Sequence, residues 1–280
     1  MSSVRLREAP LRVFPATAVS RPWRSWSGVG GLHLIERHAR VYRHAWLILL
    51  SGVGEPLFYL FSLGVGLGHL VGAVAGPAGQ PIPYVDFVAP ALLASSTMNG
   101  AITDSTFNVF FRLKYARLYD SALATPMRAE DVATGEIGWA LIRGALYAVA
   151  FLAVMAAMGL LHSWWAVMEF PASLLAGFAF AAVGMAATTC MRTWQDFDYV
   201  HLATMPMFLF SATFYPLAVY PHVMRLVVAW TPLYQAVALM RGLAFGVAGP
   251  GLLWHAGYLA AMGLAGYVIA GRRVRRRLLR

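Results

Sequence analysis

Three ionisable residues, Glu55, Asp104 and Arg143, lie inside long apolar stretches, and the polar segment RLYDSALATPMRAEDVATGE fills residues 117–136 between two of these stretches. A charge at the centre of a bilayer costs roughly 2.5–3.5 kcal/mol on insertion scales, so each charge needs a partner or water. No His, Asp or Cys set with catalytic or metal-ligand spacing accompanies them, and Cys190 is the only cysteine. These residues therefore offer charge pairing and hydrogen bonding rather than nucleophilic or metal chemistry.

Asp104 and Arg143 lie at matching depths in two neighbouring apolar runs. Asp104 precedes the end of its run at Phe111 by seven residues, and Arg143 follows the start of the next run at Glu136 by seven residues. At 1.5 Å per helical residue, both are about 10 Å from the same membrane face. We hypothesise an ion pair that ties together the two helices flanking residues 117–136. In the alternative, Arg143 extends to the interface and Asp104 faces a water-filled cavity.

Glu55 lies ten residues into the first apolar run and is followed by Pro56. It either lines a cavity or packs as a neutral, hydrogen-bonded carboxyl against a neighbouring helix, with Pro56 producing a kink. Glycines in the same run permit close helix approach, which makes this helix a candidate seam between two subunits. They are Gly52, Gly54, Gly64, Gly66 and Gly68.

Transmembrane helices are the elements that must position these charges. The chain has 280 residues, of which 59% are hydrophobic and 12% charged, whereas soluble domains carry about 25% charged residues. A spanning helix needs about 20 mostly apolar residues. Six segments approach or meet this requirement: 45–68, 85–111, 137–160, 170–191, 200–217 and 252–270. The sequence predicts an all-α membrane protein with six transmembrane helices in one domain, residues 44–271.

The basic residues predict the orientation of this domain. With the N-terminus in the cytoplasm, 19 of the 22 basic residues fall on the cytoplasmic side. This agrees with the enrichment of Lys and Arg in short cytoplasmic loops of membrane proteins. Both termini are then cytoplasmic: a flexible basic segment at 1–23 and a basic tail at 272–280 beside membrane lipid. The formal net charge is +10, but the basic residues flank apolar runs and do not gather on one soluble face. Nucleic acid is therefore not expected as a partner.

Residues 24–43 precede the first span and have an amphipathic pattern. Leu32, Ile35, Ala39 and Tyr42 recur at spacings of three to four residues, and charged residues occupy the rest of the helical wheel. This pattern predicts a helix lying in the cytoplasmic interface, with those four residues on its apolar face.

Residues 220–246 are apolar, yet Pro221 and Pro232 divide them into two pieces that are too short to span a bilayer. Both flanks must be extracellular if the last span returns inward. A pair of short re-entrant helices fits this pattern. A folded extracellular helical hairpin is the alternative.

The polar segment itself has helical order. Leu118, Tyr119, Ala122 and Leu123 form one apolar face, and Thr125-Pro126 is suited to begin the next helix, with acidic residues in its first turns. The segment is therefore predicted to be a short helix parallel to the membrane, followed by a sharp turn and the start of a second helix. It either packs as a linker on the cytoplasmic surface or acts as a lever that docks a soluble partner.

Three motifs resemble the permease subunits of type-2 ABC exporters, and most of all the nodulation lipo-oligosaccharide and daunorubicin-type drug exporter permeases. They are EPLFYLFSLGVGLG at 55–68, RLYDSALATPMRAEDVATGE at 117–136, and FLFSATFYPL with TPLYQAVALMRG within 208–242. The resemblance implies that 117–124 is the coupling helix that inserts into an ATPase subunit. The residues concerned are Arg117, Leu118, Tyr119, Asp120, Ser121, Ala122, Leu123, Thr125 and Pro126.

The same resemblance implies that 220–246 is an extracellular re-entrant pair, with Tyr215, Pro216, Pro221, Pro232 and Leu233 at the gate. Glu55, Asp104 and Arg143 would lie along the translocation path or serve as intramembrane charges. The working unit would contain two such permease subunits, as a homodimer, and two ATPase subunits. ATP and Mg would be bound by the ATPase, with no cofactor in this chain.

The chain has no phosphate-binding loop of its own. Such a loop requires Gly-Lys-Ser/Thr, and the only lysine, Lys114, stands between Leu113 and Tyr115. We therefore expect a non-enzymatic permease of the plasma (inner) membrane that exports an amphipathic substrate, either a hydrophobic drug or a lipo-oligosaccharide or other glycolipid. The alternative is a secondary transporter driven by an ion gradient. Such proteins usually have several intramembrane acids and repeated halves, whereas this sequence has few such acids and no evident repeat.

Overall fold

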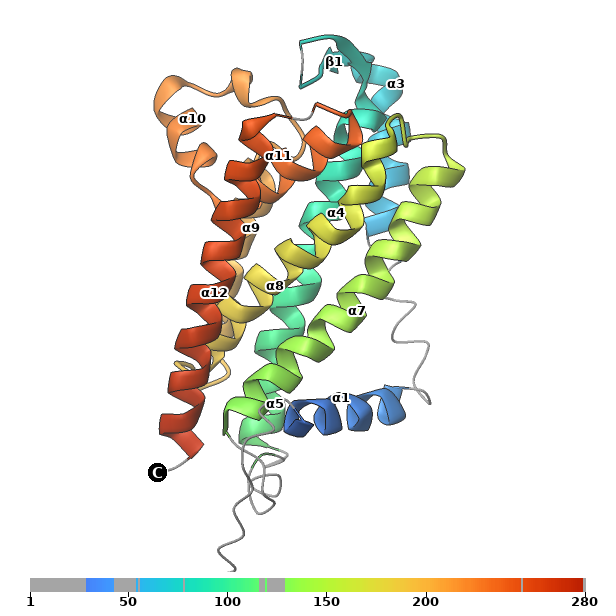
Figure 1. Ribbon diagram of the computed structural model, residues 1–280. Coiled ribbons are helices and arrows are strands. Elements are labelled where there is room, and N and C mark those ends of the chain that lie inside the picture. Colours follow the sequence, from blue (N-terminus) through green and yellow to red (C-terminus); the bar gives the residue numbers. More distant parts are fainter. Residues whose placement is uncertain are drawn as a thin grey trace, which may run out of the picture.

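The computed structural model describes residues 29–42, 54, 56–77, 79–115, 119, 129–247 and 249–278. Long helices run side by side along a bundle (Figure 1): α4 (Tyr84–Thr103), α7 (Ala129–Ala157), α8 (Glu169–Thr188), α9 (Asp196–Phe210) and α12 (Pro250–Leu278). Shorter elements lie at the two ends or extend these helices. They are α1 (Val29–Tyr42), η1 (Leu60–Leu67), α3 (Gly68–Val71), β1 (Ala73–Ala75), β2 (Pro81–Pro83), η2 (Asp104–Asn108), α5 (Val109–Lys114), η3 (Trp164–Met168), η4 (Leu217–Val219), α10 (His222–Ala229) and α11 (Pro232–Ala244).

Three helical stretches among the described residues are long and apolar enough to cross a membrane: Glu130–Ala157, Trp164–Thr188 and Pro250–Arg276. The helices His222–Ala229 and Pro232–Ala244 pass the same test only as a pair, and Pro56–Val71 is a shorter apolar helix. The helical, membrane-type character predicted from composition is confirmed. The arrangement of six spans stays a prediction.

The predicted second span, 85–111, corresponds to a continuous helical run formed by α4, η2 and α5. Its middle part, η2, is a π-helical turn that begins at Asp104. Two hydroxyl groups in this turn bond to backbone carbonyls of the preceding helical turn. Ser105 Oγ donates to the carbonyl of Ala101 at 2.7 Å, and Thr106 Oγ1 donates to that of Ile102 at 2.6 Å. Turns of this kind are frequent at functional sites.

Helix α8 packs against α4, α7 and α12 at the centre of the bundle. Small residues permit this close packing: a Cβ atom on Gly266 of α12 would lie 2.8 Å from the backbone nitrogen of Val183 in α8. On the opposite side of α8, the hydroxyl of Thr188 donates to the carbonyl of Ser105 at 2.9 Å. The π-helical turn is therefore fixed directly to the central helix.

Helix α1 lies across one end of the bundle, at the end where the C-terminal residues of α12 also lie (Figure 1). The amphipathic helix predicted for 24–43 is present over the described residues 29–42, and its predicted apolar face is confirmed in part, because Ile35 and Tyr42 are partly buried against α7. Leu34 and His38 are buried against α7, whereas Leu32 is 63% exposed and Ala39 is also exposed. The difference arises because the buried residues of α1 are those that contact α7, and one of them is the polar residue His38.

The other end of the bundle contains α10, α11 and a two-stranded antiparallel hairpin in which Val74 pairs with Ile82 (Figure 1). The hairpin was not predicted, because its strands have only three residues each and β2 contains two prolines. Helix α9 ends at Phe210, seven residues before the predicted end of the fifth span. The chain turns there through Ala212, which has a positive φ of 56°, and the helix cannot continue through such a residue.

Candidate functional site

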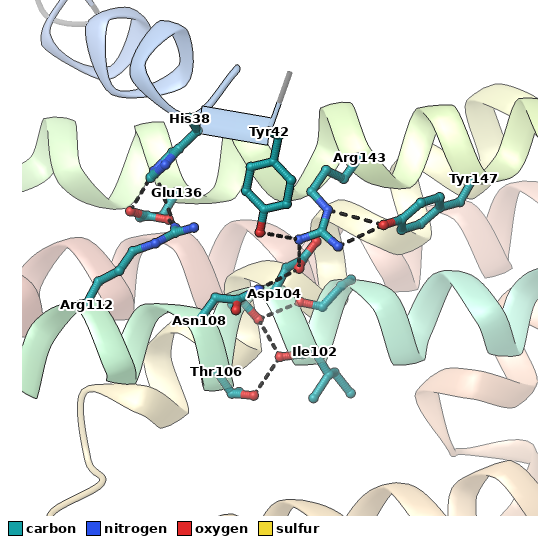
Figure 2. Close-up of polar contacts among 12 residues, drawn as sticks. His38, Tyr42, Ile102, Asp104, Thr106, Asn108, Arg112, Glu136, Arg143 and Tyr147 are labelled. Carbon is teal, nitrogen blue, oxygen red and sulfur yellow. Dashed lines mark hydrogen bonds and ion pairs between the residues drawn. The ribbon is translucent and has the colours of Figure 1, made fainter. Parts of the chain in front are cut away.

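Two buried ion pairs join α7 to the helical run that contains η2 and α5 (Figure 2). In the first pair, Arg143 Nη1 lies 2.7 Å from Asp104 Oδ1, and the two side chains are 11% and 6% exposed. The ion pair hypothesised from the equal depths of the two residues is therefore present. Because Asp104 opens η2, the pair holds α7 against the π-helical turn.

Neutral polar groups complete this first pair. Asn108 Nδ2 donates to Asp104 Oδ1 at 2.9 Å. Arg143 donates to the hydroxyl of Tyr147 at 2.7 Å from Nη2 and to the hydroxyl of Tyr42 at 3.0 Å from Nη1. Its guanidinium also lies 4.9 Å from the centre of the Tyr42 ring. Since Tyr42 is the last residue of α1, this helix is attached to the same ion pair.

The second pair joins Glu136 of α7 to Arg112 of α5, through Oε2 and Nη1. The Glu136 side chain is 2% exposed and has two further partners on its other oxygen. His38 Nε2 lies 3.1 Å from Oε1, and the hydroxyl of Tyr119 donates to Oε1 at 2.8 Å. Groups from α1, α5 and the polar segment therefore converge on a single carboxylate.

Tyr119 is the residue of the predicted coupling helix that the structure describes, and its hydroxyl bonds to Glu136 inside the helical bundle. The side chain is 2% exposed. Burial, followed by the negative charge of Glu136, raises the pKa of the Tyr119 hydroxyl well above its ordinary value. The phenol is therefore neutral at every physiological pH and remains a hydrogen-bond donor to the carboxylate. Outside the described residues lie Glu55 and the other residues predicted for the coupling helix: Arg117, Leu118, Asp120, Ser121, Ala122, Leu123, Thr125 and Pro126.

Sequence reasoning missed His38, Arg112 and Glu136 as members of this network. Glu136 served only as a marker of where an apolar run begins, and Arg112 was only one of the 19 basic residues counted on the cytoplasmic side. A usable signal existed in α1, where His38 and Tyr42 are four residues apart and thus share a helix face. Their partners come from residues 98 and 101 positions away in the chain, a separation that no local pattern reveals.

The residues predicted for the gate lie at the opposite end of the bundle. Pro221 precedes α10 and Pro232 is the first residue of α11, so the helix breaks predicted from these prolines are confirmed. The two helices are bent by 83° relative to each other. Leu233 is fully buried, whereas Tyr215 is 52% exposed. Pro216 directly precedes η4.

Arg241 of α11 is a buried residue in this region that the sequence did not single out. Its Nε donates to the carbonyl of Phe87 at 3.2 Å, and its Nη2 donates to that of Ala212 at 3.0 Å. The guanidinium lies 3.6 Å from the centre of the Phe87 ring. Arg241 therefore fastens the turn after α9 to both α4 and α11.

A cavity of about 750 Å³ lies between η1, α4, η2 and α9. Its lining is mostly apolar and aromatic, with a few hydroxyl and amide groups, and Tyr59, Asn99, Thr103, Met205 and Phe208 contribute to it. Tyr215, one of the predicted gate residues, is also in its wall. Among the described residues of α9, only Phe197 is buried. The cavity therefore has one wall that stands largely free of the bundle.

Comparison with known proteins gives a consistent result. The sequence model of the family described as ABC-2 type transporter matches residues 32–245. Nodulation protein J of Rhizobium leguminosarum bv. trifolii is 31% identical over 83% of this chain and 87% of that protein. Nodulation protein J of Sinorhizobium fredii is 30% identical over 95% of this chain and 98% of that protein. The family resemblance that the motifs indicated is confirmed over most of the chain.

Proposed function

Because the chain belongs to the ABC-2 type transporter family, we propose that it is the permease subunit of an exporter whose ATP, with Mg, is bound and hydrolysed by a separate ABC ATPase. The working unit contains two permease subunits, as a homodimer, and two ATPase subunits. It resides in the plasma (inner) membrane with both termini in the cytoplasm. The five long helices, together with the first span that includes Pro56–Val71, form the six transmembrane segments.

The bond from Tyr119 to Glu136 is the observation that carries this proposal. Residues 117–126 contact the ATPase, and Tyr119 is bonded to a carboxylate that also holds α5 and α1. A buried polar network of this kind resists deformation, because moving one member leaves another charge unpaired in an apolar surrounding. Displacement of the coupling helix therefore moves the second and third spans as one unit.

The cavity beside α9 is the part of the permease best suited to hold the substrate. Its volume of about 750 Å³ is in the range of small-molecule sites, and its lining suits an amphipathic molecule. The exposed residues of α9 that belong to the wall of this cavity, such as His201 and Met205, form the surface on which the second permease subunit packs and closes the cavity. Movement of the second span then opens the path past α10 and α11, which act as an extracellular re-entrant gate.

The substrate is an amphipathic molecule, either a lipo-oligosaccharide or other glycolipid or a hydrophobic drug. Similarity to proteins named Nodulation protein J favours the first class. The apolar lining of the cavity is compatible with both classes.

Purification of the chain together with the ATPase encoded beside it, followed by reconstitution into vesicles, tests the proposal. We expect ATP-dependent movement of a fluorescent acylated oligosaccharide or a fluorescent hydrophobic drug, with no movement when a pH gradient replaces ATP. Asp120→Arg or Leu123→Asp should release the ATPase. Asp198→Arg, which changes an exposed carboxylate near the same end of the bundle, should not. Cargo movement by the purified chain alone in a pH gradient would establish the secondary-transporter alternative instead.

A further inference from the structure

A second cavity, of about 730 Å³, lies between α8, α9 and α12, with a few residues of the η2 region also in its wall. Apolar side chains from all three helices line most of it, among them Phe180, Val183, Ala203, Met207 and Met262. It meets α9 on the side adjoining the substrate cavity described above, and Val200 and Thr204 line both cavities. We refer to it as the α8–α12 slot.

The length of the slot matches one leaflet of a bilayer. Along α8 its lining residues extend from Phe180 to Cys190 just beyond the helix, and along α9 from Asp196 to Met207. Ten to eleven residues of helix correspond to about 15 Å. The hydrocarbon core of a bilayer is about 30 Å thick, so one leaflet contributes about half of that value. An apolar slot of this length is therefore suited to an extended acyl chain.

The mouth of the slot is positively charged. Cys190 and Arg192 line it, and Arg273 of α12 donates to Cys190 Sγ. Asp196, the carboxylate at the mouth, accepts bonds from the backbone N–H groups of Arg192 at 2.6 Å and Thr193 at 3.1 Å. In the described part of the chain neither Arg192 nor Arg273 forms an ion pair with a carboxylate. Both arginines are exposed, and the C-terminal part of α12, which contains Arg273, lies at the end of the bundle where α1 lies (Figure 1).

We propose that the α8–α12 slot binds one acyl chain of an anionic glycerophospholipid from the cytoplasmic leaflet, with the lipid phosphate beside Arg192 and Arg273. Charge complementarity selects this occupant, because a phosphodiester without a cationic headgroup brings one uncompensated negative charge beside two arginines that form no salt bridge within the described residues. The inference rests on the membrane orientation in the proposed function but not on ATP-driven transport. Its consequence is that α9, the helix between the two cavities, is supported by lipid on one side and faces cargo on the other.

Native mass spectrometry of the full purified chain tests this inference, with phosphatidylglycerol and phosphatidylcholine of identical acyl chains as probes. Two arginines near a phosphate should give a preference for phosphatidylglycerol of about thirtyfold, at roughly 1 kcal/mol for each basic residue. Ala203→Trp fills the slot and should abolish retention of the lipid. Leu202→Trp, at an exposed neighbouring position that lines neither cavity, should retain it.

The combined variant Arg192→Gln/Arg273→Gln should reduce the preference to nearly one, whereas Arg37→Gln on the exposed face of α1 should leave it unchanged. Circular dichroism shows whether each variant is folded. Equal binding of both lipids to the unmodified chain, or full retention by folded Ala203→Trp, would overturn the proposal. Binding to monomers but not to dimers would also overturn it, since a second copy would then occupy the slot. No ATPase is present, so failure of ATP-driven export leaves this result unaffected.

Discussion

Replacement of Tyr119 by Phe removes one hydroxyl group from the network around Glu136 and leaves the shape of the side chain unchanged. The lost bond is 2.8 Å long and ends on a carboxylate whose side chain is 2% exposed. A hydrogen bond to a charged group contributes about 1.5–3 kcal/mol. Because Tyr119 itself is buried, water is poorly placed to replace the hydroxyl. We expect the free energy of unfolding to fall by about 1.5–3 kcal/mol.

Unfolding of the purified chain in mixed micelles, followed by tryptophan fluorescence, measures this loss. Tyr115→Phe is the matched control, since Tyr115 is 63% exposed, and surface substitutions change stability by no more than about 0.5 kcal/mol. A double-mutant cycle with Glu136→Gln isolates the interaction. Residues in one hydrogen-bond network show coupling energies of about 0.5–3 kcal/mol, and a coupling near zero would show that the bond does not hold the segment.

Tyr119→Phe also distinguishes two roles of Tyr119: transmitting motion from the coupling helix to the spans, or only stabilising the fold. If Tyr119 transmits the motion of the coupling helix, Tyr119→Phe in the assembled exporter should lower cargo transport per ATP hydrolysed while the ATPase remains bound. If the contact only stabilises the fold, the ratio of transport to hydrolysis should stay at the value of the unmodified complex in every molecule that remains folded. The latter result would refute the assignment of Tyr119 as the joint.

Three further predictions concern the packing of the bundle. Asp104→Ala and Arg143→Ala should each cost about 3–5 kcal/mol of unfolding free energy, because each leaves a buried charge unpaired, and the reciprocal swap of both residues should recover part of that loss. Gly266→Ala should destabilise the bundle by about 1–3 kcal/mol by forcing α12 from α8, whereas Gly257→Ala, which has open space beside it, should be neutral or stabilising. Arg241→Lys should lower the thermal midpoint despite keeping the charge, because lysine cannot donate from a fork to two carbonyls; an unchanged midpoint would show that charge alone suffices.

Much of the architecture could be predicted because it depends on local patterns. Apolar runs located the long helices, and Pro221 and Pro232 located the breaks around α10 and α11. The pairing of Asp104 with Arg143 followed from depth alone, since two charges at equal depth in adjacent helices need partners. These predictions required no knowledge of which helix faces meet.

The remaining features depend on contacts between segments that are distant in sequence. The buried face of α1 was predicted only in part, because α1 also buries His38, which the hydrophobic pattern places among polar residues. The early end of α9 follows from the positive φ of Ala212 and from the bond of its carbonyl to Arg241, 29 residues later. The cavities on two sides of α9 likewise depend on how helices from the whole chain are arranged.

The spacing of the two ion pairs suits the network to the proposed transmission of motion. On α7, Glu136 and Arg143 are seven residues apart, so they lie on the same helix face about 10 Å from each other. Their partners, Arg112 and Asp104, are eight residues apart on the facing run. Two attachment points prevent one helix from pivoting on the other, whereas a single ion pair would permit rotation.

Helix α1 contacts both attachment points, because His38 lies at the Glu136 pair and Tyr42 at the Arg143 pair (Figure 2). It therefore acts as a brace across the two helices at the proposed cytoplasmic face. Tyr119 bonds to Glu136, which lies nearer the end of the bundle than Arg143. A displacement at Glu136 therefore acts on two helices that the Arg143–Asp104 pair also joins deeper in the bundle. In the proposed exporter, a push on the coupling helix would thus move whole spans toward or away from the cavity beside α9, instead of being absorbed by local bending near the membrane surface.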